Sequence, residues 1–189
     1  MEDKYFVHPT SIVDDNVEIG DGTKVWHFSH IMSGAKIGKN CSFGQNVNIG
    51  TNAVIGDNCR VQNNVSIYEG VELGNNVFCG PSMVFTNDPF PRADSDKGKD
   101  AWRKTIIEDG ASICANATIV CGHKLGKRSM VAAGAVVTKD VPSHALVAGV
   151  PARRIGWVCD CGTKLDDKLK CSYCGKEFEK FEDGLKVKR

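Results

Sequence analysis

The strongest constraint on the fold is an aliphatic residue that returns every six positions along most of the chain. The stretch "IGDNCRVQNNVSIYEGVELGNNVFCG" carries it at Ile55, Val61, Ile67, Leu73 and Cys79. The same spacing runs without a break from Val7 to Phe85. A period of six fits neither an α-helix nor the two-residue alternation of an ordinary strand. It indicates stacked units, because one such unit cannot bury its apolar face alone.

Two further columns complete the repeat. Four places after each aliphatic residue stands a mostly small one, as at Ala35, Cys41 and Ala53. Three places after, the sequence reads Asn16, Gly22, Phe28, Gly34, Asn40, Asn46, Asn52, Asn58, Asn64, Gly70 and Asn76. Glycine and asparagine tolerate positive φ, so this column predicts tight turns. A short strand with two inward side chains and then a turn, repeated, predicts an all-β parallel solenoid.

The register fails after Phe85 and resumes at Ile107, a gap that is not a multiple of six. We therefore expect residues 86–106 to form a loop ejected from the solenoid, and a long loop of this kind is usually functional or disordered. Its cations are candidate ligands for phosphates or a carboxylate: Arg92, Arg103 and Lys104. The alternative is a solvated loop in which Asp94, Asp96 and Asp100 supply the counter-charges.

The overall charge and hydropathy exclude several classes of protein. The chain has 24 basic and 23 acidic residues among 189, which gives no field for nucleic acid or a membrane surface. No apolar run is long enough for membrane insertion, and the N-terminus "MEDKYFVHPT" lacks a signal-peptide stretch. We therefore expect a cytoplasmic protein whose cysteines are reduced or bind metal.

The hexads, the ejected loop and the segment "GVPARRIG" together resemble the left-handed parallel β-helix, or hexapeptide-repeat, acyltransferases over about residues 5–156. The resemblance implies three hexads per triangular coil, a homotrimer with active sites between subunits, and acetyl-CoA as donor. It also implies coenzyme A contacts at Ala133, Gly134, Thr138, Lys139, Arg153 and Arg154. The alternative for the two arginines is a solubilising role near the terminus.

A narrower resemblance rests on "KVWHFSHI", "GQNVNIG", "YEGVELGNNVFCGPSMVFTND" and "ANATIVCG". These segments are similar to the N-acetyltransferases that acetylate the 3-amino group of UDP-2-acetamido-3-amino-2,3-dideoxy-glucuronic acid for lipopolysaccharide (O-antigen) or other surface glycans. Enzymatic alternatives are another nucleotide-activated amino sugar or a small hydroxyl acceptor. A γ-type carbonic anhydrase or a non-enzymatic solenoid scaffold fits the sequence less well, because the histidine spacing and the Arg-rich loop speak against them.

With three hexads per coil, residues eighteen apart stack on one face. His27, Gln45 and Asn63 then form one outward column, and His30, Asn48 and Ser66 form a second on the same flat side. On the next side Ser33, Thr51, Glu69 and Asn87 align beside Tyr68 and Thr86. The resulting polar wall is either a substrate-binding surface, formed by Gln45, Asn48, Asn63, Tyr68 and Glu69, or a solvated stripe.

Two kinds of catalytic residue are candidates. The resemblance implies that Asn87, in "FTN", orients the sugar amine for attack. His27 and His30 are the rival general bases, because imidazole titrates near neutral pH, although either ring could instead pack on Trp26 or Phe28. His123 stands in a small inward slot, which indicates either a bulged coil or a ring at the subunit interface.

The nine cysteines divide into three groups. Cys41, Cys59 and Cys79 fill inward slots and are expected in the core, and Cys114 and Cys121 fall at turns and should be partly exposed. Cys159, Cys161, Cys171 and Cys174 have the pattern of a small structural zinc ribbon, which defines a C-terminal extension over residues 157–189 after a β-helix domain over residues 1–156. The alternative is a metal-free tail, and "FEDGLKVKR" is expected to be a solvated end.

Overall fold

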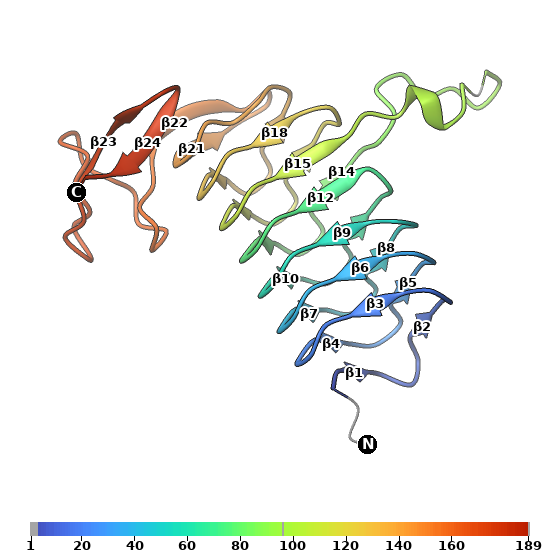
Figure 1. Cartoon of the computed structure of the whole chain (residues 1–189). Coiled ribbons are helices and arrows are strands. Elements are labelled where there is room, and N and C mark those ends of the chain that lie inside the picture. Colours follow the sequence, from blue (N-terminus) through green and yellow to red (C-terminus); the bar gives the residue numbers. More distant parts are fainter. Residues whose placement is uncertain (1–3, 96, 189) are drawn as a thin grey trace.

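The computed structural model describes residues 4–95 and 97–188. Three sheets, parallel except for the last strand of sheet A, form the sides of a triangular solenoid, and the chain passes through them in turn (Figure 1). Sheet A contains β1 (Phe6–Val7), β4 (Lys24–Val25), β7 (Ser42–Phe43), β10 (Arg60–Val61), β13 (Phe78–Cys79), β16 (Ser112–Ile113), β19 (Met130–Val131), β21 (Ala145–Ala148) and β22 (Arg153–Trp157). Sheet B contains β2 (Ile12–Val13), β5 (His30–Ile31), β8 (Asn48–Ile49), β11 (Ser66–Ile67), β14 (Val84–Phe85), β17 (Thr118–Ile119) and β20 (Val136–Val137). Sheet C contains β3 (Glu18–Ile19), β6 (Lys36–Ile37), β9 (Val54–Ile55), β12 (Val71–Leu73), β15 (Thr105–Ile107) and β18 (Lys124–Leu125).

The register of these strands confirms the predicted stack. Lys24 pairs with Ser42 and Ser42 with Arg60, so residues eighteen apart lie directly above one another. The aliphatic column is buried from Val25 onward, and the turn column has positive φ, for example 55° at Asn40 and 75° at Gly34. The six-residue period therefore encodes both the core and the corners of the solenoid.

Small polar residues in the inward slots fasten one coil to the next. The Thr23 hydroxyl donates to the carbonyl of Gly38 (2.9 Å) and accepts from the N–H of Cys41 (3.0 Å). Ser29 makes the same pair of bonds one side further along, to Gly44 and Val47. The thiols follow the same rule, because the Sγ atoms of Cys41 and Cys59 lie 3.1 Å from the carbonyl oxygens of Gly56 and Gly74. Cys79 is also fully buried, so all three predicted core thiols are confirmed.

The predicted loop leaves the solenoid between β14 and β15, at the corner between sheets B and C, and projects from the body in Figure 1. It is two residues shorter than expected, because Thr105 and Ile106 belong to β15. Thr105 is buried in an inward slot and donates its N–H to Gly70. Leu73 pairs with Ile107, so the coil closes normally beneath the loop. A 3-10 turn, η1 (Lys99–Ala101), lies within it, and no helix in the described part of the chain is long and apolar enough to cross a membrane.

After the last coil, β22 pairs antiparallel with β21, and the cysteine-containing segment leads to a hairpin of β23 (Phe178–Phe181) and β24 (Gly184–Val187). The expectation of a solvated end is wrong. Leu185 is buried and donates its N–H to the carbonyl of Ser143 (3.2 Å). Gly184 packs so closely there that a Cβ atom would lie 2.8 Å from the Ser143 oxygen. The hairpin therefore docks on the solenoid.

Two hydrophobic clusters form the interior. The larger follows the solenoid axis, and the smaller contains Cys159, Leu165, Cys171, Phe178 and Leu185. Trp157 packs against both clusters. The division of the chain near residue 157 remains a prediction, with Trp157 at the junction.

Candidate active site

The structure corrects the position of the first predicted column. His27, Gln45 and Asn63 each occupy the first position of a two-residue turn, so they lie at the corner between sheets A and B and not on a flat side. Ser33, Thr51 and Glu69 lie at the B–C corner for the same reason. The cause is local, because most sides of the triangle keep only a two-residue strand, and after one connecting residue the chain already turns.

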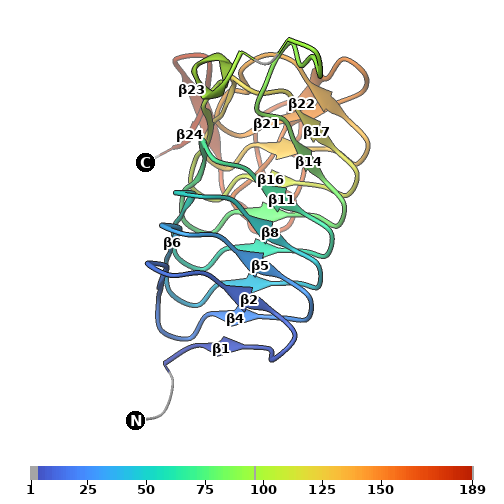
Figure 2. The same cartoon turned by 90° about the vertical axis from the view of Figure 1, so that its right-hand side faces the viewer.

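The second column is confirmed as a stack. His30 pairs with Asn48, Asn48 with Ser66, and Ser66 with Val84, all in sheet B. The first three face outward and are half-buried, and we call them the polar stripe. Figure 2 shows the strands that carry it, β5, β8 and β11, one above another up to β14. The stripe thus leads along one side of the solenoid to the root of the ejected loop.

Asn87 stands at this root on a firmly held backbone. Its carbonyl accepts from the N–H of Arg103 (2.9 Å), which closes the base of the loop. The preceding Thr86 is fixed twice, since its N–H donates to Ile119 (3.1 Å) and its hydroxyl accepts from the N–H of Cys121 (3.0 Å). Asn87 is half-buried, and within the described residues its side-chain amide has no hydrogen-bond partner. The geometry offers a positioned amide with both donor and acceptor capacity.

The loop cations divide into paired and unpaired groups. Lys99 contacts Glu69 (2.5 Å) and Lys104 contacts Glu72 (2.6 Å), so solenoid carboxylates hold the loop down. Over the described part of the chain, the exposed guanidinium groups of Arg92 and Arg103 have no acidic partner. A cavity of about 360 Å³ opens between loop and solenoid, lined by Asn52, Glu69, Gly70, Glu72, Lys99, Trp102, Arg103 and Lys104. Of the proposed counter-charges, Asp96 lies outside the described residues, and neither Asp94 nor Asp100 forms an ion pair within them.

The two candidate histidine bases lie far from this root within one chain. The His27 ring stacks on His8, with centroids 3.6 Å apart, and is flanked by Trp26 and Phe28. Partial burial, and secondarily the neighbouring His27, lower the pKa of His8. His30 Nε2 lies 2.8 Å from Asp14 Oδ1. Both candidates belong to the second coil, three ladder steps from the level of β14.

Other predicted binding residues have defined surroundings. Asn63 Oδ1 accepts from the N–H of Gln45 (2.9 Å), so this side-chain oxygen already has a partner within the A–B corner. Tyr68 is exposed beside Glu69. Sequence reasoning missed Trp102, which lines the loop cavity with Lys99 over its ring. Nothing in the sequence marked Trp102 as a cavity residue, because the loop has no periodicity from which its position could be predicted.

The corner near His123 differs from expectation in one respect. Cys121 is buried and not partly exposed, because its backbone is bonded to Thr86 beneath the loop, whereas Cys114 is half-buried as predicted. His123 occupies the predicted slot but stays partly exposed, with Nδ1 3.4 Å from Asp140 Oδ1. Its carbonyl accepts from Ile106, so the coil remains in register.

Most of the residues predicted to bind coenzyme A meet at the end of the solenoid. Thr138, Lys139, Arg153 and Arg154 line one cavity of about 170 Å³. The Arg154 guanidinium lies 4.3 Å above the Trp157 ring, and Arg153 Nη1 donates to the carbonyl of Ala152 (2.9 Å). Ala133 and Gly134 lie at the A–B corner just before β20 and do not line this cavity.

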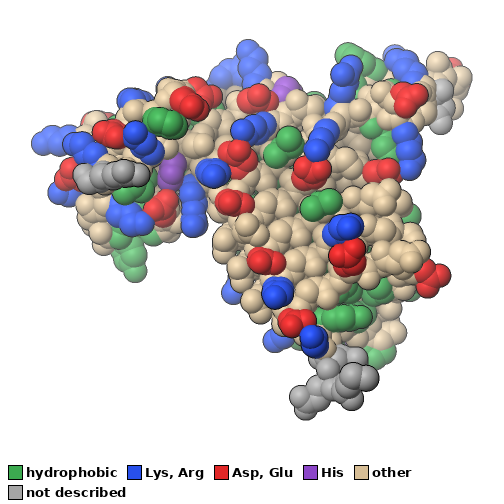
Figure 3. Space-filling model, viewed as in Figure 1, with side chains coloured by type: hydrophobic (Ala, Val, Ile, Leu, Met, Phe, Trp, Pro, Cys, Tyr) green, Lys and Arg blue, Asp and Glu red, His purple; other side chains and the backbone are tan. Residues whose placement is uncertain are grey.

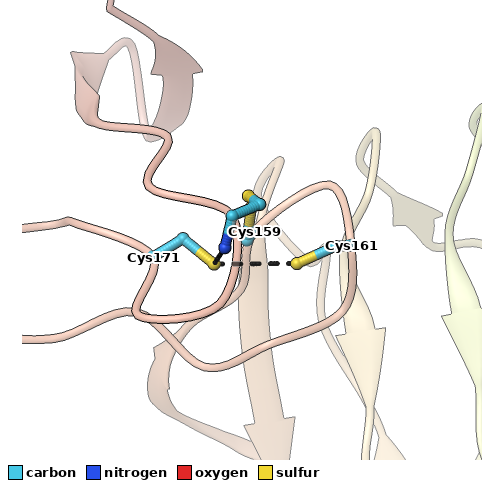
Figure 4. A group of neighbouring side chains, drawn as sticks. Cys159, Cys161 and Cys171 are labelled. Carbon is cyan, nitrogen blue, oxygen red and sulfur yellow. Dashed lines mark hydrogen bonds between the residues drawn. The ribbon is translucent and has the colours of Figure 1, made fainter.

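The four C-terminal cysteines converge on one point, and Figure 4 labels three of them, Cys159, Cys161 and Cys171. The Sγ atoms of all four lie within 4.8 Å of one another, with 3.4 Å between Cys159 and Cys174 and 3.6 Å between Cys161 and Cys171. Tetrahedral zinc at about 2.3 Å from each sulfur requires sulfurs about 3.8 Å apart, so the donor set fits a closed structural site. Hydrogen bonding to Thr163 lowers the pKa of Cys161 to about 6, whereas burial raises that of Cys159 to about 12.

Comparison with known proteins places this geometry in context. Residues 16–51 match the family model "Bacterial transferase hexapeptide (six repeats)", and residues 34–69 and 104–139 match "Hexapeptide repeat of succinyl-transferase". The dTDP-3-amino-3,6-dideoxy-alpha-D-galactopyranose 3-N-acetyltransferase of Aneurinibacillus thermoaerophilus is 47% identical over 183 residues, covering 95% of this chain and 93% of that protein. The 2,3,4,5-tetrahydropyridine-2,6-dicarboxylate N-acetyltransferase of Staphylococcus aureus (strain JH9) is 44% identical over 82 residues, 43% of this chain and 31% of that protein.

Solved structures share the fold. WeeI from Acinetobacter baumannii AYE aligns with a TM-score of 0.52 at 24% identity, over 78% of this chain and 56% of that one. The acetyltransferase domain of PglB from Neisseria gonorrhoeae FA1090, in complex with acetyl coenzyme A, aligns with a TM-score of 0.52 at 20% identity, over 80% and 58%. At these identities the likeness concerns the solenoid alone.

Proposed function

The chain belongs to the hexapeptide-repeat acetyltransferases, and from this premise we propose that it transfers the acetyl group of acetyl-CoA to the 3-amino group of a nucleotide-linked amino sugar. The observation that carries the proposal is the 47% identical relative, named as a 3-N-acetyltransferase and aligned over nearly the whole chain. The free amide of Asn87 at the loop root supplies a site for the amine.

The proposed chemistry needs positioning more than strong acid or base catalysis. The neutral sugar amine attacks the thioester carbonyl, the carbon–sulfur bond breaks, and the amine proton passes to solvent or to the departing thiolate. An amide side chain is not a base, so Asn87 orients the amine by accepting its hydrogen bond. Orientation of two bound reactants can supply up to about 7–11 kcal/mol of the barrier reduction.

The donor end of the site is proposed at the last coils. Thr138, Lys139, Arg153 and Arg154 share one cavity, and arginine binds phosphates through paired N–H donors. Arg154 is held in place by Trp157, which reduces the side-chain entropy lost on binding. Ala133 and Gly134 would border the pantetheine side of the same region, at the neighbouring corner.

Two acceptors are candidates. They differ in the nucleotide, in the substituent on carbon 2 of the sugar and, most relevant to charge, in the group at carbon 6. The sequence resemblance favours UDP-2-acetamido-3-amino-2,3-dideoxy-glucuronic acid, whose carboxylate would meet the unpaired Arg92 and Arg103. The bacterial relative is named for a dTDP-linked 3,6-dideoxy sugar, which has a methyl group there. Gln45, Asn48, Asn63, Tyr68 and Glu69 remain proposed acceptor contacts. A role in lipopolysaccharide or another surface glycan, in the cytoplasm, belongs to the proposal.

The proposed active unit is a homotrimer with sites between subunits. Apolar side chains exposed on the outer faces of sheets B and C support it: Ile12, Val84, Val54 and Ile106 are 60%, 46%, 42% and 38% exposed. Apolar groups in such positions are stabilised when a second chain covers them. The polar stripe and the loop lie on these same sides, where a neighbouring chain would complete the site.

We further propose that Cys159, Cys161, Cys171 and Cys174 bind a structural zinc ion, for which the sulfur spacing is suited. The ion would hold the C-terminal extension together, since its own apolar cluster is small.

The function is tested by product analysis with acetyl-CoA and a panel of nucleotide-linked 3-amino and 4-amino sugars. We expect one acetyl group on nitrogen 3, identified by NMR of the product, and the highest kcat/KM for the 3-amino uronate. Preference for the dTDP-linked deoxy sugar would transfer the assignment to that acceptor. Acetylation of a hydroxyl group, equal rates with 4-amino sugars, or no transfer to any member of the panel would contradict it.

A further inference from the structure

Five rings gather at and beside the A–B corner of the first two coils, three ladder steps from the level of the loop root. Phe6, His8, Trp26, His27 and Phe28 form this cluster, which we call the aromatic corner. Phe6, Trp26 and Phe28 are 41%, 40% and 60% exposed, although they are among the most hydrophobic side chains in the chain. Such a concentration of exposed rings requires a reason other than the core.

The backbone conformation of Phe28 is unfavourable for a large side chain, which supports a function for the exposed ring. Phe28 has φ 56°, at a turn position where the next two coils place Asn46 (57°) and Asn64 (62°). A bulky residue is disfavoured in this region, and burial does not compensate here because the ring is mostly in solvent. Strained residues of this kind are concentrated at ligand sites. The aromatic ring at position 28 therefore makes this turn less stable than asparagine would.

The rings are also held in a fixed arrangement. Phe6 and Trp26 lie 5.5 Å apart, and His8 and His27 stack at 3.6 Å. The Thr10 hydroxyl accepts from the N–H of Phe28 (3.1 Å) and lies 2.9 Å from His8 Nδ1, which fixes the corner from below. A rigid set of exposed π faces suits a flat heteroaromatic ligand, because stacking needs little side-chain reorganisation.

The position of the corner relates it to the acceptor. The polar stripe begins beside it at His30 and runs past Asn48 and Ser66 to the level of Asn87. Three ladder steps correspond to about 14 Å along the axis, at the usual strand spacing. An extended nucleoside diphosphate sugar can reach across this distance with its base at the corner, its diphosphate over the hydrogen-bonding stripe, and its amine at Asn87.

We propose that the aromatic corner is the stacking platform for the pyrimidine base of the nucleotide-linked acceptor. This inference rests on the proposed function and deepens it. The platform explains why the sugar must carry a nucleotide: the base binds at the aromatic corner, three coils away from the reacting amine at Asn87. Stacking recognises the π face, so the corner accepts uracil and thymine alike, and the selection between sugars is left to the loop.

The test is Phe28→Asn, which gives this turn the residue of the next two coils. We expect its thermal midpoint and oligomeric state to match or exceed those of the wild type, because asparagine relieves the backbone strain. The dissociation constants for UDP and dTDP, measured by titration calorimetry, should rise about tenfold or more. The KM for acetyl-CoA should change less than about twofold. Phe181→Asn, which removes an exposed ring from the hairpin, is the matched control and should leave all these values unchanged.

The possible outcomes of this experiment distinguish the stacking platform from the proposed function. Unchanged nucleotide affinity in Phe28→Asn, in an enzyme that still acetylates its acceptor, overturns the platform while leaving the proposed function intact. Dissociation of the oligomer by Phe28→Asn also overturns it, since the corner would then be a contact between copies of the chain. Failure of the wild type to act on any nucleotide-linked amino sugar instead contradicts the function itself.

Discussion

The backbone carbonyl of Asn87 and the N–H of Arg103 lie 2.9 Å apart and join the two ends of the ejected loop. The chain between them leaves the solenoid and returns to the same corner, where Thr105 continues the ladder onto Gly70. Asn87 therefore takes its position from the rigid coils, whereas the guanidinium groups of Arg92 and Arg103, which have no acidic partner among the described residues, can adapt to a ligand. A fixed amide next to adaptable cations suits a reaction that depends on orientation.

The first prediction concerns the histidines. His27→Ala and His30→Ala should each keep kcat within about tenfold of the wild type, because His27 is stacked, His30 is paired with Asp14, and both lie three coils from Asn87. General bases usually contribute about 10²–10⁴ to the rate. Steady-state kinetics across pH 6–9 makes the measurement, with KM for the acceptor expected to rise in His27→Ala. A fall of more than about 100-fold in kcat, with loss of the acidic limb of the pH profile, would assign a base.

A second prediction concerns the inward hydroxyl groups. Thr23→Val should lower the free energy of unfolding by about 1–3 kcal/mol, because it leaves the Gly38 carbonyl and the Cys41 N–H without partners. Ser129→Ala is the matched control, since the Ser129 hydroxyl is buried and has no partner among the described residues. Denaturant unfolding should show Ser129→Ala equal to or more stable than the wild type. Equal losses in the two variants would show that these hydroxyl groups do not fasten the coils.

The third prediction concerns the donor site. Arg154→Ala should raise the KM for acetyl-CoA about tenfold and change kcat little, because a phosphate contact made equally in ground and transition states affects binding alone. Titration with coenzyme A measures the same loss directly. Arg60→Ala, on the exposed outer face of sheet A and without an ion pair in the described part of the chain, is the control. A normal KM in Arg154→Ala would remove this residue from the donor site.

A fourth prediction concerns the metal. Protein freed of adventitious ions should contain about one zinc per chain, and Cys174→Ser should lose it together with protection of β23 and β24 from proteolysis. Cys114→Ser, a change to a half-buried solenoid thiol, should retain both. Zinc well below half an equivalent in the wild type, with the hairpin still protected, would mean that the extension folds without metal.

The solenoid was predictable from sequence because each turn of chain repeats the same physical requirement. Positions such as Asn40 and Asn58 must adopt positive φ, and positions such as Val61 must be buried, so the pattern is written locally. The same regularity placed His30, Asn48 and Ser66 in one stack. It did not distinguish a flat side from a corner, and His27 was therefore assigned to the wrong one.

The parts without a period could not be predicted in this way. The last residues appeared solvated because their charges dominate, yet Leu185 docks on Ser143, a contact that no local pattern encodes. The ion pair between Lys99 of the loop and Glu69 of the solenoid likewise joins residues far apart in the sequence, so no local pattern predicts it. The sequence showed that Phe28 occupies a turn position, but its proposed role in binding depends on the exposure of its ring and on the nearby rings Phe6 and Trp26, which only the structure gives.

The central claim is that Asn87 orients the sugar amine at the loop root, and the kinetics of Asn87→Ala test it most directly. The account predicts a kcat about 100-fold lower with acetyl-CoA and the preferred 3-amino sugar, because misorientation of the attacking group costs about that factor. The KM for acetyl-CoA and the thermal midpoint should stay near the wild type. Asp94→Asn, an exposed change in the same loop, should have full activity. Wild-type turnover by Asn87→Ala would contradict the account.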